Sequence, residues 1–279
     1  MRPSLRVILV LLCASWSASL HAQLPFYTDD TEVTNTGTLH FESYNEYDGL
    51  QSSEYPNRRQ NTTNFKLNYG FPHRLEVDFD VPYLAIGRAT GQQNSFGMGD
   101  VDMGLKWKIR KSDVAAHLPA LATTFYAEFP TGDVKEQLGS GLRDYWLNFI
   151  VQEPFSEKTR ANLNLGFLFA GNTSTGVVGI QTTRGHVATG GLSVLHDFSP
   201  KLTLGGEVYG GVADVNGLGR NQLQGMLGGL YALRETLSVT FGVLGGKYPG
   251  SPRFGGQVGV AVDFPHFLHK LPAKRPQHD

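Results

Sequence analysis

Residues 74–83 read Arg-Leu-Glu-Val-Asp-Phe-Asp-Val-Pro-Tyr, and this stretch decides the fold class. Apolar side chains alternate with charged ones along it, so one face of the segment is apolar and the other is charged. Alternation with a period of two predicts a half-buried β-strand. The same pattern returns in residues 101–109, 144–152, 161–169 and 257–264. No segment has a comparable period of 3.6 residues, so the chain is expected to be all-β.

The alternating blocks number about twelve, and the connections between them differ in length. We expect strands at 37–47, 62–70, 74–83, 100–110, 118–129, 143–153, 159–170, 185–196, 202–212, 221–233, 237–244 and 253–264. Short turns near 70–73 and 234–236 alternate with longer loops such as 84–99 and 130–142. Short turns at one end and long loops at the other are typical of bacterial outer-membrane barrels.

Alternation alone does not separate a membrane barrel from a soluble β-sandwich or a closed soluble barrel, because all of them have one apolar face. Three features favour the membrane. The apolar faces carry almost no charge over the roughly ten residues that a tilted spanning strand needs. The last strand, 258–264, ends in an aromatic residue. Aromatic side chains also gather at strand ends, as in an interfacial girdle: Tyr69, Tyr83, Trp107, Phe129, Tyr145 and Phe264. The prediction is an antiparallel, up-and-down transmembrane β-barrel of about 12 strands.

The two ends of the chain are expected to lie outside this barrel. Residues 1–22 have the basic start, the apolar run and the small-residue end of a secretory signal peptide. Residues 23–36 are apolar enough near Phe26 to enter a lumen as a short plug. The barrel then spans 37–264, and residues 265–279 form a periplasmic tail.

The overall composition excludes several classes of protein. With 24 basic and 25 acidic residues, the formal net charge of −1 argues against a nucleic-acid partner. The one cysteine, Cys13, lies in the expected signal peptide and excludes a disulfide framework. The 34 glycines among 279 residues are about twice the ordinary share.

Two short motifs carry a family resemblance. Gly97-Met98-Gly99-Asp100 leads into one expected strand, and Phe129-Pro130-Thr131-Gly132-Asp133 ends the next. With residues 75–83 and 164–167, they resemble the family of outer-membrane proteins named for the meta-pathway of phenol degradation. The resemblance spans residues 36–264 and implies an outer-membrane barrel, which we expect to be a channel for aromatic or other apolar molecules. Read physically, both motifs are turns rich in Gly, Pro and Asp; a ligand-contacting role is the alternative.

The sequence shows no catalytic, cofactor or metal signature. Ser193 and His196 fall on opposite faces of one strand. His266, His269 and His278 do not match the spacing of a closed zinc site. We therefore expect no enzyme activity, no cofactor and no metal.

The polar faces supply the candidate lumen-lining residues. They are Glu42, Lys66, Arg74, Glu76, Asp78, Asp80, Asp102, Lys106, Lys108, Glu128, Asp144, Glu207 and Asp263. Their charges either brace neighbouring strands through ion pairs or create a field that selects permeants. Lys66 is expected near Glu76 or Asp78, and Asp80 near Lys106 or Lys108. Small residues such as Gly205 and Gly242 in the later strands suggest a roomier lumen there.

The functional hypothesis is passive passage of small apolar or aromatic molecules through a monomeric outer-membrane barrel. Its partners would be outer-membrane lipid and a small-molecule permeant. A non-transporting structural or surface-binding barrel and a lipid-acting enzyme remain the alternatives.

Overall fold

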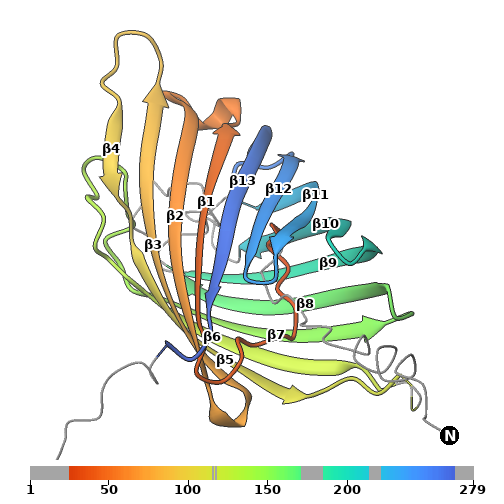
Figure 1. Ribbon diagram of the computed structural model, residues 1–279. Coiled ribbons are helices and arrows are strands. Elements are labelled where there is room, and N and C mark those ends of the chain that lie inside the picture. The colour runs from red at the N-terminus through yellow and green to blue at the C-terminus, as the bar shows by residue number, and fades with distance from the viewer. Residues whose placement is uncertain (1–24, 115, 117, 171–184, 214–220, 268–279) are drawn as a thin grey trace, which may run out of the picture.

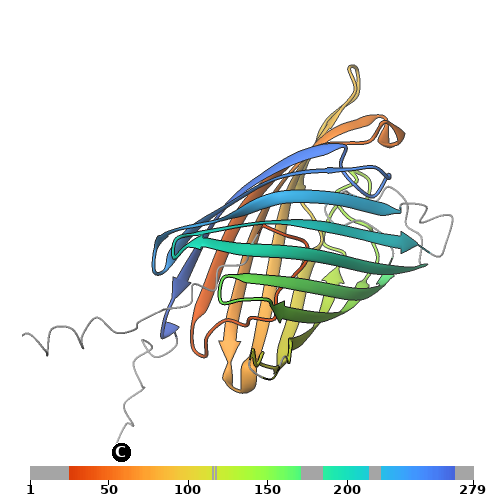
Figure 2. The same ribbon diagram turned by 90° about the vertical axis from the view of Figure 1, so that its right-hand side faces the viewer.

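The structure, a computed structural model, describes residues 25–114, 116, 118–170, 185–213 and 221–267. Its strands form one antiparallel sheet that closes on itself (Figures 1 and 2). They are β1 (Leu39–Gly49), β2 (Asn57–Phe71), β3 (Leu75–Arg88), β4 (Ser95–Met98), β5 (Val101–Arg110), β6 (Ala120–Phe129), β7 (Asp144–Pro154), β8 (Thr159–Ala170), β9 (Gly185–Ser199), β10 (Leu202–Ala213), β11 (Gln222–Arg234), β12 (Leu237–Gly246) and β13 (Phe254–Phe264).

Twelve of these strands make the barrel wall. Neighbours in sequence pair along the wall, β3 pairs with β5, and β13 pairs with β1 to close the ring. The short strand β4 pairs only with residues 83–86 of β3 and is not one of the twelve strands of the closed ring. The predicted all-β, antiparallel, up-and-down barrel of about twelve strands is confirmed.

The two faces of the wall have the opposite character to those of a soluble protein. Many inward side chains are polar and buried; Lys106 and Asn68, for example, are each 1% exposed. Outward side chains are apolar and exposed, and Leu227 reaches 68%. A soluble sheet buries its apolar face. An apolar exterior around a polar interior instead matches a barrel surrounded by lipid.

Outward aromatic side chains mark the two edges of the apolar band. Tyr83, Phe129 and Tyr145 lie at the end of the barrel that carries the long loops, and Trp107 and Phe264 lie at the end with the short turns. All five are at least 36% exposed. The expected girdles at the strand ends are therefore present. Within the described residues, no helix is long and apolar enough to cross a membrane.

Strands β2 and β3 are longer than the sequence pattern predicts. They continue through 57–61 and 84–88, which were expected to be loops, and β4 lies inside the expected loop 84–99. Residues 57–61 read Asn-Arg-Arg-Gln-Asn, so no apolar alternation marks them. This part of β2 rises past the apolar band, where an outward face no longer has to be apolar, and pairing with β3 holds it in place.

Residues 25–36, which we call the N-terminal segment, run inside the barrel (Figures 1 and 2). The segment leaves the lumen at the short-turn end, where Thr36 forms an isolated bridge with Gly70 of β2. A side chain at Gly70 would collide with the main chain of Thr34 and Asn35, so this close approach requires glycine.

Candidate functional site: the lumen and its N-terminal segment

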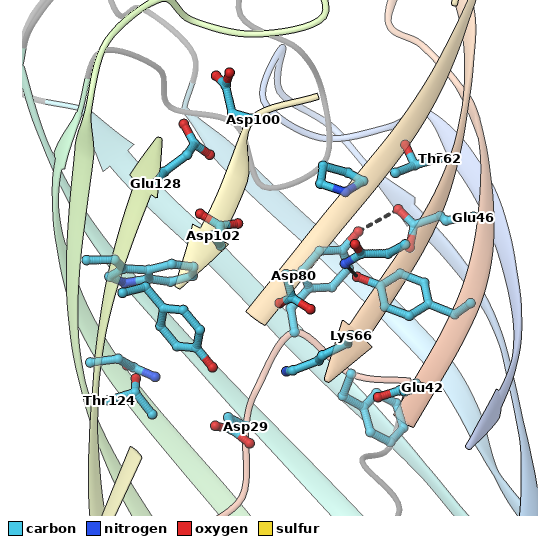
Figure 3. Close-up of a pocket in the computed structure, with 18 of the residues that line it drawn as sticks. Asp29, Glu42, Glu46, Thr62, Lys66, Asp80, Asp100, Asp102, Thr124 and Glu128 are labelled. Atoms are coloured by element: carbon cyan, nitrogen blue, oxygen red, sulfur yellow. Dashed lines mark hydrogen bonds between the residues drawn. The ribbon is translucent and has the colours of Figure 1, made fainter. Parts of the chain in front are cut away.

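The lumen contains a cavity of about 370 Å³. Its wall comes mainly from β1, β2, β3, β5, β6 and β7, and part of it from the N-terminal segment. Figure 3 shows Asp100, Asp102 and Glu128 on one side of this cavity, Glu42 and Glu46 on the other, and Asp29 below. Nine acidic side chains therefore line this cavity, together with aromatic, apolar and neutral polar ones.

The predicted lumen-lining residues fall into groups. Those at the cavity are Glu42, Lys66, Asp80, Asp102, Glu128 and Asp144. Those in contact with the N-terminal segment are Glu76, Lys106, Lys108 and Glu207. Asp78 accepts a hydrogen bond of 2.8 Å from the hydroxyl of Tyr126. Asp263 is not among the residues that line the cavity; it pairs with His40 at 2.7 Å, at the short-turn end.

Arg74 does not line the lumen, so that prediction is wrong. It ends the short 3₁₀ turn η2 (Pro72–Arg74), is exposed, and has a φ of 63°. The alternation that begins at Leu75 was extended one residue too far, into a turn that only reverses the chain.

Two buried lysines hold the N-terminal segment rather than a neighbouring strand. The Nζ of Lys106 lies 2.8 Å from Asp29 Oδ1 and 3.6 Å from Asp30 Oδ1. Lys108 pairs with Glu32. The expected approach of Asp80 to these lysines is wrong, because Asp80 stands opposite Asp102 in the β3–β5 register. Burial raises the pKa of the Asp29 carboxyl, and the ammonium of Lys106 partly opposes this.

Polar side chains of the wall also bind the main chain of the segment. Glu207 accepts hydrogen bonds from the N–H groups of Tyr27 and Thr28 at 3.0 and 2.8 Å. Asn164 accepts from the N–H of Asp29 and donates to its carbonyl oxygen, at 3.1 and 2.8 Å. The segment is thus anchored to β10, β8 and β5, three strands that are not direct neighbours in the ring.

The strand register sets the charge pattern of the cavity wall. Lys66 stands opposite Glu42 on one side and Asp80 on the other, instead of Glu76 or Asp78. Asp80, Asp102, Glu128 and Asp144 then stand opposite one another across four adjacent strands. Like charges in direct opposition repel, so this row concentrates acidic side chains on one part of the cavity wall.

The lumen is not roomier beside the later strands, contrary to the prediction from their small residues. The space above inward glycines there is filled by side chains from neighbouring strands: Met226 lies over Gly242, and Leu195 lies over Gly205. Both covering side chains are buried. The described cavity instead lies beside the charged strands.

The cavity also includes aromatic residues that are not among the predicted lumen-lining residues. Tyr44, Tyr126 and Trp146 line it, together with Phe26 and Tyr27 of the N-terminal segment. Tyr126 and Trp146 stand opposite each other in the β6–β7 register. Both have even numbers, like Glu128 and Asp144, and the alternation along β6 and β7 therefore places them on the inward face. Alternation alone could have predicted them as lumen-lining residues.

An apolar exterior, a polar lumen and a closed ring of twelve strands define a transmembrane β-barrel. No protein family model matches the sequence, and no curated protein matches it either. Solved structures share the fold. An outer membrane channel from Pseudomonas putida F1 aligns with a TM-score of 0.67 and 15% identity, over 84% of this chain and 98% of that chain.

Two further structures align less closely. The KdgM porin in complex with disordered oligogalacturonate has a TM-score of 0.53 and 12% identity, over 81% of this chain and 99% of that chain. The translocator domain of the autotransporter NalP from Neisseria meningitidis has a TM-score of 0.51 and 12% identity, over 83% of this chain and 90% of that chain. At these identities the likeness establishes the barrel fold, and function rests on the lumen.

Proposed function

We propose that this protein is a passive channel of the outer membrane for small molecules. The observation that carries the proposal is the cavity of about 370 Å³ inside a closed wall whose inner face is polar. A polar lumen inside an apolar exterior is the arrangement of water-filled barrel channels. The channel and porin with the same fold, and the motifs that resemble the phenol meta-pathway family, support this choice.

We place the short-turn end in the periplasm and the long loops outside the cell, as in bacterial barrels. The predicted signal peptide, residues 1–22, lies outside the described residues, and so does most of the tail, 265–279. Both are consistent with export and a periplasmic end. The protein would act as a monomer in outer-membrane lipid.

The cavity wall indicates the permeant class. Aromatic rings such as Tyr126 and Trp146, with Leu84 and Leu168, offer contact surface for an aromatic molecule. Of the described lining residues, nine carry carboxylates and only Lys66 is basic. A cavity of one sign concentrates ions of the other sign. We therefore propose that small aromatic molecules pass when they are neutral or cationic, and that anions are disfavoured.

We further propose that the N-terminal segment partly plugs the channel. It lines the cavity from Pro25 to Asp30 and is held by the ion pairs of Lys106 and Lys108. Passage would then depend on the space beside the segment or on its release from the wall.

A swelling assay with the purified protein in liposomes tests the channel and the permeant class together. The solutes are benzyltrimethylammonium, phenyl glucoside and benzenesulfonate, three aromatic probes that carry a fixed positive, zero or negative charge. We expect swelling rates to fall in that order. Fastest entry of benzenesulfonate would refute the permeant class. No entry of any probe would refute the channel and favour a non-transporting barrel.

A further inference from the structure

The two sequence motifs that carry the family resemblance meet in space at the long-loop end. Asp100 lies between β4 and β5, and residues 130–143 form the loop from β6 to β7. Asp100 Oδ1 accepts a hydrogen bond of 2.9 Å from the N–H of Gly132, and Oδ2 accepts one of 2.8 Å from the N–H of Ser140. The hydroxyl of Thr131 donates to the carbonyl oxygen of Gly99 at 2.8 Å.

This carboxylate is well placed to hold the loop. Asp100 is only 7% exposed, and each of its oxygens binds a different part of the loop. Hydrogen bonds to an ionised carboxylate are about twice as strong as neutral ones. A side chain at Gly139 would collide with the Asp100 carboxylate, so the loop main chain passes directly against it.

A second contact turns the middle of the loop inward. Leu138 is 4% exposed and packs with Leu84 and Ile86, the inward residues of the extended part of β3. Leu138 and Gly139 line the cavity together with Asp100. The loop therefore lies across the mouth of the lumen, and Figure 3 shows Asp100 at the upper edge of the cavity.

The outer part of the loop binds β2, β3 and β4. Gln137 accepts hydrogen bonds from Asn57 of β2 at 3.0 Å and from Arg88 of β3 at 3.2 Å. Glu136 accepts one of 2.8 Å from the hydroxyl of Ser95 in β4. The unexpected lengths of β2 and β3, and the presence of β4, are explained by this role, since they supply the surface on which the loop rests.

From these contacts we infer that Asp100 is a positioning residue that keeps the β6–β7 loop folded across the mouth and so sets the width of the entrance. Its effect on flux rests on the proposed channel function. Its effect on the loop does not, and the two are measured separately.

The position of the loop is measured with a cysteine at Leu138. The only other cysteine is Cys13 in the predicted signal peptide. A water-soluble maleimide is reacted with the folded protein in a Cys13→Ser background that carries Leu138→Cys alone, or with Asp100→Ala, Asp100→Asn or Asp102→Asn added. Asp102→Asn is the matched control, because it removes a carboxylate from the same cavity wall.

We expect Asp100→Ala to raise the labelling rate at least tenfold, which corresponds to about 1.4 kcal/mol in favour of the open loop. Asp100→Asn, which keeps one acceptor oxygen, should fall between this and the parent. Asp102→Asn should label at the parent rate. Parent-like labelling of Asp100→Ala would overturn the inference, and so would equal rates for Asp100→Ala and Asp102→Asn, because charge alone would then explain the change.

Two further measurements keep the test independent of the reporter. If Leu138→Cys does not fold, trypsin cleavage after Lys135 in Asp100→Ala replaces labelling, with heat-modifiability on a gel as the check of folding. Conductance in bilayers then tests the entrance: Asp100→Ala should conduct more than Asp102→Asn. Faster labelling with unchanged conductance would overturn the entrance role, whereas no conductance in any variant would refute the proposed channel and leave the loop result to stand.

Discussion

The exchange Lys106→Met tests how firmly the N-terminal segment is held. Methionine keeps most of the length of lysine but removes the ammonium, which lies 2.8 Å from Asp29 and 3.6 Å from Asp30. Lys106 is 1% exposed, while the side chain of Asp29 is 21% exposed. Removing one partner of a buried ion pair costs about 3–5 kcal/mol. Partial exposure of Asp29 favours the lower end, about 3 kcal/mol, which is roughly a 150-fold shift towards release.

Release is measured by labelling a cysteine placed at Thr31, a residue that is fully buried against Gln152. In Lys106→Met, a water-soluble maleimide should react about a hundred times faster than in the parent. Lys158→Met removes an exposed lysine from a short turn and should label at the parent rate. Equal labelling of the Lys106→Met and Lys158→Met proteins would refute the assignment of Lys106 as an anchor.

In Lys106→Met, binding of the N-terminal segment to the wall should depend on pH. Burial raises the pKa of Asp29 in the bound segment, and removing Lys106 takes away the stronger of the two cations that oppose the rise, leaving Lys66. The bound segment then takes up a proton more readily than the released one, so binding is strongest below the raised pKa and is lost as the pH increases through it. Acidification should therefore slow the labelling of Lys106→Met. Faster labelling in acid would contradict this account.

Three further outcomes follow from the wall. Glu207→Ala should speed hydrogen exchange at the two amides that Glu207 binds at least tenfold, and Glu207→Gln should do so less, because its amide oxygen still accepts. Leu227→Arg should destabilise the folded barrel in liposomes by about 2–4 kcal/mol in urea unfolding, while Phe155→Arg in a short turn should leave the midpoint unchanged. Gly205→Ala, whose new Cβ would lie 2.5 Å from the carbonyl oxygen of Val194, should cost about 1–3 kcal/mol in the same assay, whereas Gly225→Ala, where the nearest atom lies 3.7 Å from the new Cβ, should be neutral.

The strands were predictable because lipid imposes a strict rule on their outward faces. For β8, alternation alone predicted both boundaries of the strand, residues 159 and 170. Residues 57–61 were missed because they rise past the lipid, where that rule no longer applies. Arg74 was misplaced for a related reason: alternation continues by chance into a turn.

The site was predictable only in part, because it depends on contacts between distant segments. Inward parity selected Lys106 and Glu207 but did not reveal their partners. Asp29 lies 77 residues from Lys106 in the sequence, and only the path of the segment through the lumen brings them together. Likewise, the packing of Met226 over Gly242 depends on the strand register. The number of small side chains therefore did not predict where the lumen is open.

The most direct test of a cation-preferring channel is the reversal potential of the wild-type protein in a planar bilayer under a KCl gradient. Nine carboxylates around one described cavity, with Lys66 as its only basic side chain, predict stable ion current whose reversal potential has the sign for K⁺. The preference should weaken at high salt, where charges are screened. A correctly folded barrel that carries no current, or a reversal potential with the sign for Cl⁻, would contradict the account.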